Sequence, residues 1–161
     1  MKQLAIRPAR IDETGAIYAV HRDSVTALCA GHYTPAQVAM WLDGRTPEMY
    51  LDAVAGGRLW VASGDDGAIA GFVEIEGRVL TKLFIRGASA GSGLGRRLLA
   101  TAVDAIRASG AETVHLEATR NACDFYRKHG FVEIGTGTFS RGNSPVALEI
   151  VKMELALSRP R

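Results

Sequence analysis

The stretch Gly91-Ser92-Gly93-Leu94-Gly95 lies between a predicted strand and a predicted helix that opens with Arg96 and Arg97. Glycines allow successive backbone N–H groups to face one way, and a helix N-terminus adds positive potential there. The backbone amides from Ser92 to Arg96 therefore predict a phosphate-binding loop. Because glycine also marks ordinary turns, a flexible turn before a helix is the alternative interpretation.

The spacing argues against two common phosphate loops. No Gly-Lys-Ser/Thr sequence ends the stretch, as a mononucleotide P-loop requires, and Arg96 stands where a dinucleotide-binding fingerprint has its third glycine. A nucleotide P-loop and a Rossmann-type site are both disfavoured.

A second segment, Leu116 to Phe131, carries Asn121, Phe125 and Tyr126 in the pattern Asn-x-x-x-Phe-Tyr-x-x-x-Gly-Phe. With the glycine-rich loop, this segment resembles the GNAT superfamily of N-acetyltransferases. The resemblance implies that the loop binds the pyrophosphate of acetyl-CoA and that the second segment flanks the pantetheine and the thiol. Ala90 departs from the family pattern, which has Gln or Arg at that position.

The resemblance also assigns cofactor contacts to the neighbouring elements. The pantetheine arm would pair with backbone groups of Leu83, Phe84 and Ile85, as an additional strand pairs with a sheet edge. The alternative is that these three are ordinary core residues. Asn121 would hydrogen-bond to pantetheine, or serve only as a helix N-cap.

Acetyl transfer to an amine requires that the amine lose a proton, because a free primary amine is mostly protonated at neutral pH. Tyr126 stands where the family places the acid that protonates the departing thiolate; an aromatic packed beside Phe125 is the alternative. Residues Val79 to Lys82, where many members carry an acidic base, contain no acid. Glu74 is the preferred base, and three other side chains remain candidates: Glu76, Glu117 and His115.

Cys123 is expected to be a small packed residue and not a nucleophile. This favours direct transfer of the acetyl group in a ternary complex. The early segment His32 to Gln37, together with Trp41, is similar to a bacterial subgroup of the family like the YafP acetyltransferase. The resemblance implies that Tyr33, Trp41 and the loop at Arg141 contact the acceptor. Aromatic residues that only staple short helices are the alternative.

These residues must be positioned by a mixed α/β (α+β) fold, with a GNAT-like, mostly antiparallel central sheet and helices on both faces. Hydrophobic periodicity and turn residues predict the elements. The expected strands are a short one through Leu4 and Ile6, then 59–63, 68–76, 79–85, 113–118, 131–139 and 146–155. The expected helices are one capped by Asp12, one starting at Thr34-Pro35, and 48–55, 95–109 and one from Asn121 to His129.

The 161 residues fit a single domain, 1–161, with a tail at 158–161. A formal charge of +2 provides no general field for nucleic acid, and no apolar run approaches the length of a signal peptide or a membrane span. Cys29 and Cys123 are too few for a disulfide framework or a metal knuckle and suit a reducing cytoplasm. No metal, membrane or nucleic-acid partner is expected.

The sequence thus indicates an N-acetyltransferase that uses acetyl-CoA as co-substrate and a small-molecule or peptide amine as acceptor. A catalytically silent CoA-binding sensor of the same fold is the main alternative. Nucleic-acid binding through Lys82, Arg86, Arg96 and Arg97 is a weaker one. A homodimer is compatible with the sequence, which fixes neither the oligomeric state nor the acceptor.

Overall fold

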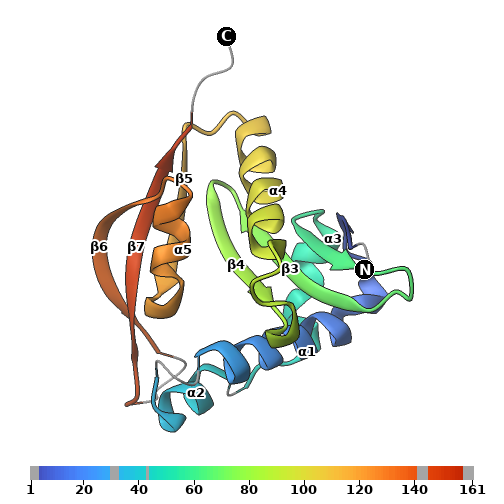
Figure 1. Cartoon of the computed structure of the whole chain (residues 1–161), viewed down its shortest axis with the longest axis horizontal. Helices are drawn as coiled ribbons and strands as arrows, with labels where there is room; N and C mark the ends of the chain where they lie inside the picture. The colour runs from blue at the N-terminus through green and yellow to red at the C-terminus, as the bar shows by residue number, and fades with distance from the viewer. Residues whose placement is uncertain (1–3, 30–32, 43, 141–144, 158–161) are drawn as a thin grey trace.

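The computed structural model describes residues 4–29, 33–42, 44–140 and 145–157. It contains a seven-stranded sheet in the order β1-β2-β3-β4-β5-β7-β6 (Figure 1). Only β4 and β5 run parallel; the other neighbouring pairs are antiparallel. The mixed, mostly antiparallel sheet expected from the sequence is therefore confirmed. Its strands are β1 (Ala5–Pro8), β2 (Leu59–Ser63), β3 (Ile69–Glu76), β4 (Val79–Ile85), β5 (Thr113–Thr119), β6 (Val132–Phe139) and β7 (Leu148–Ala156).

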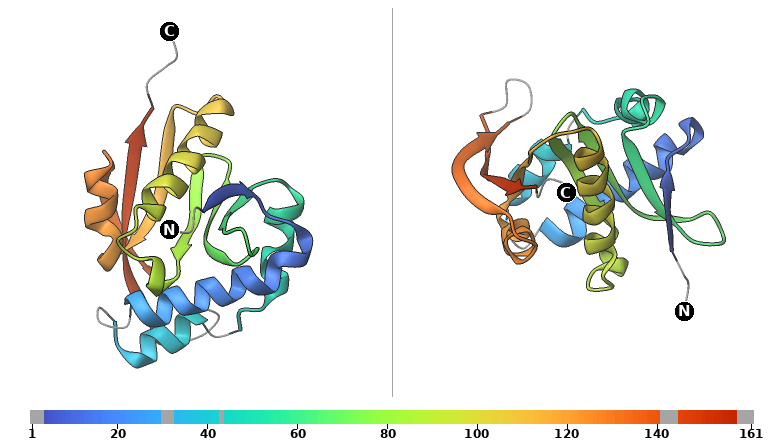
Figure 2. Two further views of the ribbon diagram at one scale, coloured as in Figure 1. Left: turned by 45° about the vertical axis from the view of Figure 1, so that its right-hand side comes forward. Right: turned by 90° about the horizontal axis from the view of Figure 1, so that it is seen from above.

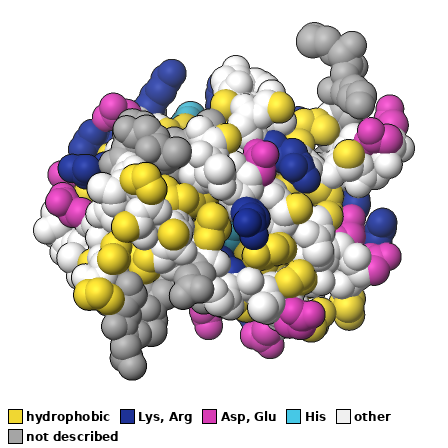
Figure 3. Space-filling view, turned by 90° about the horizontal axis from the view of Figure 1, so that it is seen from below, with side chains coloured by type: hydrophobic (Ala, Val, Ile, Leu, Met, Phe, Trp, Pro, Cys, Tyr) yellow, Lys and Arg dark blue, Asp and Glu magenta, His cyan; other side chains and the backbone are white. Residues whose placement is uncertain are grey.

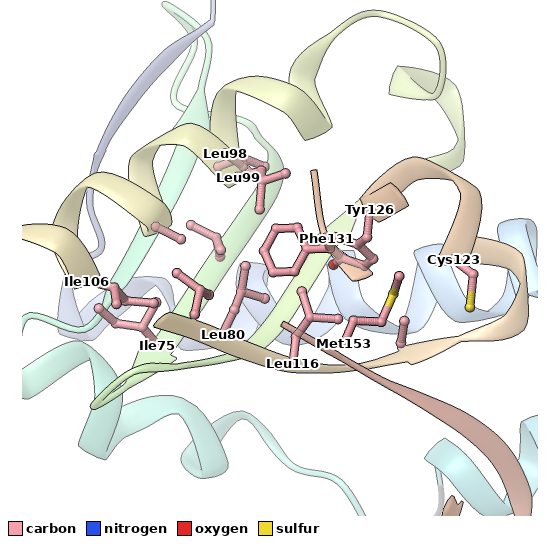
Figure 4. Packing of buried hydrophobic residues seen from close by; sticks show 14 of the residues in the cluster. Ile75, Leu80, Leu98, Leu99, Ile106, Leu116, Cys123, Tyr126, Phe131 and Met153 are labelled. Atoms are coloured by element: carbon pink, nitrogen blue, oxygen red, sulfur yellow. The ribbon is translucent and has the colours of Figure 1, made fainter. Parts of the chain in front are cut away.

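Helices cover both faces of this sheet (Figure 2). On one face, α4 (Leu94–Ala108) and α5 (Cys123–Lys128) bury their apolar sides against the strands. Figure 4 shows Leu98, Leu99 and Ile106 of α4 directed towards strand residues such as Leu80 and Leu116. On the other face, α1 (Thr14–Ser24) and α3 (Leu51–Ala55) pack on β2 and β3.

The remaining helical segments are short. A π-helical turn, Val25–Cys29, continues α1, and α2 (Pro35–Leu42) follows. Single 3₁₀ turns occur at Ile11–Glu13, Pro47–Tyr50, Gly87–Ser89 and Arg120–Ala122. No helix in the described part of the chain is long and apolar enough to cross a bilayer.

The helix starts test the capping predictions. Thr34 and Gln37 form the expected capping box: the Gln37 amide N–H donates to Thr34 Oγ1 at 3.1 Å, and the Thr34 N–H donates to Gln37 Oε1 at 2.9 Å. The predicted cap at Asp12 is wrong. Asp12 lies inside a 3₁₀ turn, and Glu13 instead accepts the Arg10 backbone N–H at 2.8 Å. Glu13 is held there by Arg7, whose guanidinium donates to both of its oxygens.

Some expectations fall on residues outside the described ranges. These are His32, the loop at Arg141, and the tail at 158–161; the side chains of Leu28 and Cys29 are also outside the description.

The most consequential feature for the site is the course of β4. Its register against β3 shifts so that Glu74 pairs with Lys82 and Ile75 with Leu80, which leaves Thr81 as an extra residue in β4. A bulge of this kind bends the strand that carries it. On its other side, β4 pairs with β5 only through Val79 with His115 and Leu80 with Leu116. Beyond Leu80 the two strands part.

Candidate active site

A cavity of about 650 Å³ lies where β4 and β5 part. Residues of both strands and of α5 line it together with residues from α1, α2, β6 and β7, so the sheet provides its floor and helices provide its walls. Its lining includes His21, Trp41, Arg45, Met49, Val79, Thr81, Lys82, Leu83, Phe84, His115, Glu117, Ala122, Tyr126 and Phe139.

The parted strand exposes a backbone edge to this cavity. Leu83 and Phe84 pair with β3 through Val73 and Phe72, but β5 provides no partner on their other side. A strand edge of this kind can accept an extended ligand through main-chain hydrogen bonds. Leu83 and Phe84, predicted to contact pantetheine, therefore lie on an open strand edge beside the cavity, and the contact itself stays a prediction. Ile85 does not line the cavity and instead packs towards Gly71.

The glycine-rich loop follows β4 and leads directly into α4. Gly91 and Gly93 have positive φ angles of 77° and 84°, a conformation that favours glycine. The first helical bond runs from the Arg97 N–H to the Gly93 carbonyl at 3.3 Å. The N–H groups of Gly93, Leu94, Gly95 and Arg96 therefore precede the helical hydrogen-bond ladder, which is the arrangement that binds anions.

The loop differs from the prediction at Ser92. Its N–H and its hydroxyl both donate to the Ser89 carbonyl, at 3.3 Å and 2.6 Å, so Ser92 stabilises the turn. Leu94, the first residue of α4, is buried in the core and anchors the helix start. An added Cβ at Gly95 would lie 3.5 Å from the Phe125 ring, so the second predicted segment lies against the loop.

Tyr126 lies in α5 and lines the cavity, although only 6% of its surface is exposed. Its ring packs edge-on against Phe125 and Phe131, at centroid distances of 5.1 Å and 5.6 Å. Burial raises the pKa of the Tyr126 phenol, and Cys123 adds to that effect. The phenol is therefore protonated at neutral pH and can act as a hydrogen-bond donor or an acid.

Asn121 lies in the 3₁₀ turn before α5, not at a helix cap, and its side-chain oxygen is buried. It does not line the cavity, whereas the next residue, Ala122, does.

Glu74 is buried in β3 and is not among the residues that line the cavity. Its carboxylate accepts hydrogen bonds from Lys82 Nζ at 2.8 Å and from Thr81 Oγ1 at 2.5 Å. The cavity side of this pair is therefore the Lys82 ammonium and the bulged Thr81. Of the alternative bases, Glu117 and His115 do line the cavity, and Glu76 is exposed at the end of β3.

Aromatic residues form the wall opposite α5. His21 stacks on Phe84 with ring centroids 4.0 Å apart, and Trp41 contacts both rings edge-on. The Tyr50 hydroxyl lies 2.7 Å from His21 Nδ1, and burial raises the pKa of Tyr50 to about 12. Figure 3 looks onto the side of the molecule that carries α1 and α2, where hydrophobic side chains are exposed among charged ones.

Tyr33, predicted to contact the acceptor, does not line the cavity. Its hydroxyl accepts the Arg120 backbone N–H at 2.8 Å and donates to the Glu149 carbonyl at 3.4 Å. Its ring packs edge-on against Trp41. Tyr33, which precedes α2, thus packs against Trp41 and links this segment to Arg120, just after β5, and to the start of β7.

Sequence reasoning missed several lining residues, namely His21, Arg45, Met49 and Phe139. None belongs to a recognisable motif, and each reaches the cavity from a different element. The described part of the chain holds no cluster of three His, Cys, Asp or Glu side chains arranged for a metal ion.

Comparisons with known proteins agree with this geometry. Residues 29–157 match the family model described as an acetyltransferase (GNAT) domain. A GCN5-related N-acetyltransferase structure from Rhodopseudomonas palustris superposes with a TM-score of 0.86 at 24% identity, covering 98% of each chain. The PaiA N-acetyltransferase of Thermoplasma acidophilum, in complex with coenzyme A, gives 0.77 at 21% identity over 96% of this chain and 99% of that one.

A third structure, YncA from Salmonella typhimurium with acetyl-CoA, gives a TM-score of 0.72 at 18% identity over 99% of this chain and 96% of that one. A search of curated proteins with this sequence gives no match. These likenesses show the fold, and the family-model match shows the family; they do not distinguish the YafP-like subgroup.

Proposed function

This chain belongs to the GNAT acetyltransferase family, and from that premise we propose that it transfers an acetyl group from acetyl-CoA to a primary amine. Transfer is direct, in a ternary complex of protein, acetyl-CoA and acceptor. The acceptor is a small-molecule or peptide amine.

The observation that carries the proposal is the parting of β4 and β5 next to the glycine-rich loop. The loop and the start of α4 provide backbone N–H groups for the pyrophosphate of the cofactor. The open edge at Leu83 and Phe84 provides backbone groups for the pantetheine arm. A pantetheine laid along that edge leads its thiol into the cavity that Tyr126 lines.

Tyr126 is the proposed acid. When the amine attacks the thioester carbonyl, the C–S bond breaks and the sulfur leaves as a thiolate, which a nearby O–H stabilises or protonates. The raised pKa of the Tyr126 phenol keeps that proton on the oxygen until the thiolate forms. Cys123 is not suited to a covalent mechanism, because burial raises the pKa of its thiol and its Sγ lies 3.5 Å from the Thr119 carbonyl.

A CoA-binding sensor without turnover is the second candidate, and one observation favours it. The stretch from Val79 to Lys82, where many family members carry an acidic base, contains no acid, and the carboxylate of the buried Glu74 is held by Lys82. Nucleic-acid binding is less well supported, because three of the four cationic side chains that could contact nucleic acid already have partners within the protein. Arg86 Nε donates to the Ile69 carbonyl, Arg97 Nη2 donates to the Leu4 carbonyl, and Lys82 pairs with Glu74.

The test combines binding and turnover. The purified protein is melted with and without acetyl-CoA, and then incubated with acetyl-CoA and a panel of amino acids, polyamines, aminoglycosides and short peptides while released CoA thiol is measured. We expect a higher melting temperature with acetyl-CoA and thiol release that depends on one amine class. A melting shift without any amine-dependent release would establish the sensor, and the absence of both would refute the proposed function.

A further inference from the structure

His115 and Glu154 form a polar pair at the end of the cavity where β4 and β5 still hydrogen-bond. They are direct register partners across β5 and β7, so their side chains share one face of the sheet. His115 Nδ1 lies 3.6 Å from Glu154 Oε1. On its other side, the His115 backbone N–H donates to the Arg78 carbonyl at 3.0 Å, which fixes the strand position.

The two ring nitrogens of His115 have different surroundings. Nδ1 is buried and makes no hydrogen bond to any described residue, because 3.6 Å to Glu154 is slightly beyond hydrogen-bonding distance. The side chain as a whole is 21% exposed and lines the cavity. A proton arriving from the cavity can therefore reach the imidazole only at Nε2. Catalytic hydrogen bonds are often long in ligand-free enzymes and tighten when substrate binds.

We propose that His115 is the base that deprotonates the acceptor amine at Nε2, and that Glu154 is the positioning residue that holds Nδ1–H towards β7. This assignment rests on the proposed function, and it moves the base from the strands before the loop to β5. Val79 begins the stretch from Val79 to Lys82, where many family members carry an acid, and it is the register partner of His115 across β4 and β5. An imidazole at this place reaches the same region of the cavity from the neighbouring strand.

The other candidate bases are less well placed for this role. A proton from the cavity reaches Glu74 only past the Lys82 ammonium, which lies 2.8 Å from its carboxylate. Glu117 lies two residues along β5 from His115 on the same face and is exposed. A carboxylate there can attract an incoming ammonium, whereas the neutral imidazole of His115 offers a ring nitrogen that can accept its proton.

Several charged groups face this pair and set the electrostatics. Glu154 favours the imidazolium, and Arg78 Nη1, 3.8 Å from Glu154 Oε1, opposes it in part. Glu117 on β5, Lys82 on β4 and Arg45 after α2 also line the cavity or its entrance. The Glu154 carboxylate lies 3.6 Å from His115 Nδ1, so its removal takes away a group that favours the charged form of the ring.

Two side chains, His115 and Tyr126, carry the protons that the reaction moves. The ammonium of the acceptor gives one proton to His115 Nε2, which later releases it to solvent. The free amine attacks the thioester carbonyl, the C–S bond breaks, and the nitrogen loses its second proton. Tyr126 gives its proton to the thiolate, and the second proton lost by the nitrogen restores the Tyr126 hydroxyl. The products are therefore the amide, the CoA thiol and one proton released to solvent.

The first test is the pH dependence of kcat/KM with the fastest acceptor of the amine panel. We expect His115→Gln to lose about 10²-fold or more at neutral pH and to approach the parental rate at high pH, where free amine is abundant. Glu154→Gln should move the acid limb to lower pH with a smaller loss. Glu149→Gln, an exposed glutamate on the same strand β7, serves as the matched control and should keep the parental profile.

The second test needs no acceptor. Nitrogen and carbon NMR of the histidine rings, with His115→Gln used to assign the signals, reports which ring nitrogen carries the proton. We expect the neutral His115 ring to be protonated at Nδ1 in the parent and to shift towards Nε2–H in Glu154→Gln. An Nε2–H ring in the parent, or a His115→Gln variant with a parental pH profile, overturns the assignment. Both results leave acetyl-CoA binding and turnover intact, and so are distinct from a failure of the proposed function.

Discussion

The cofactor side and the acceptor side of this cavity are built in different ways. On the cofactor side, the glycine-rich loop and the edge of β4 offer backbone groups, and the residues are contiguous from Leu83 to Arg96. On the acceptor side, side chains from α1, α2, β5 and β6 meet across the sheet, and no two of them belong to one motif. A backbone site depends on local conformation, whereas a side-chain site depends on which distant elements the fold brings together.

This difference implies different sensitivities to mutation. The cofactor side should respond to changes that alter backbone conformation or block access to the N–H groups, and tolerate changes in most side chains. The acceptor side should respond to the chemistry of single side chains while acetyl-CoA binding stays unchanged. Tyr126 lies at the junction of the two, because α5 touches the loop through Phe125 and the cavity through Tyr126.

The largest expected effect is therefore on turnover at this junction. Tyr126→Phe keeps the ring that packs on Phe125 and Phe131 but removes the hydroxyl, so we expect kcat to fall by about 10²-fold or more. The melting shift with acetyl-CoA should be unchanged. Because burial raises the pKa of Tyr126, the parent should keep its proton donor up to at least the usual tyrosine value of about 10.

Tyr18→Phe, at a half-buried tyrosine of α1 away from the cavity, is the control and should turn over at the parental rate. A Tyr126→Phe variant that is equally fast, with chemistry shown to be rate-limiting, would make Tyr126 a packing residue.

A second variant is expected to impair acetyl-CoA binding and leave the acceptor side unchanged. Gly93→Glu places a carboxylate at the start of α4, where it would repel the pyrophosphate and occupy its approach. We expect most of the cofactor stabilisation to disappear, which for the parent is about 2.7 kcal/mol at a ligand concentration 100 times Kd. Thermal melting across an acetyl-CoA titration measures it.

The matched control for this variant is Gly67→Glu in the β2–β3 turn. Gly67 and Gly93 have φ angles of 80° and 84°, and an added Cβ at either meets no heavy atom within 4 Å. The backbone strain is thus alike, and only the position differs. Equal cofactor shifts in the two variants would show that the loop does not hold the phosphate.

The same contrast explains what the sequence could predict. The strands, the helices and the loop conformation follow from local patterns, such as the capping box of Thr34 and Gln37 and the glycines at positive φ. The Thr81 bulge has no such local pattern, because it results from the registers of β3 and β5 on either side of β4. The Glu154 partner of His115 likewise depends on the β5–β7 register, which hydrophobic alternation alone does not fix.

A smaller effect is expected from the aromatic wall of the acceptor side. Trp41→Leu removes edge-on contacts with His21 and Phe84 while leaving an apolar side chain in the cavity. We expect KM for the amine to rise by about 10-fold, in line with the 1.4 kcal/mol that corresponds to such a change, and the acetyl-CoA melting shift to stay the same. A rise in the acetyl-CoA Kd with an unchanged amine KM would place Trp41 on the cofactor side.

The smallest effect on turnover is expected at Glu74, the base that the sequence favoured. Glu74→Gln removes the ionic partner of Lys82 but keeps an oxygen that can accept the Thr81 hydroxyl, so the β4 bulge should persist. The Lys82 ammonium would then repel an incoming ammonium, and we expect KM for the amine to rise by up to about 5-fold, which corresponds to about 1 kcal/mol of binding free energy. The shape of the pH–rate profile should not change, because no proton passes through Glu74. A loss of activity in Glu74→Gln that is large at neutral pH and vanishes at high pH would instead identify Glu74, on β3, as the base. The acceptor side would then not be centred on β5, and its contrast with the cofactor side, which is built from backbone groups, would no longer hold.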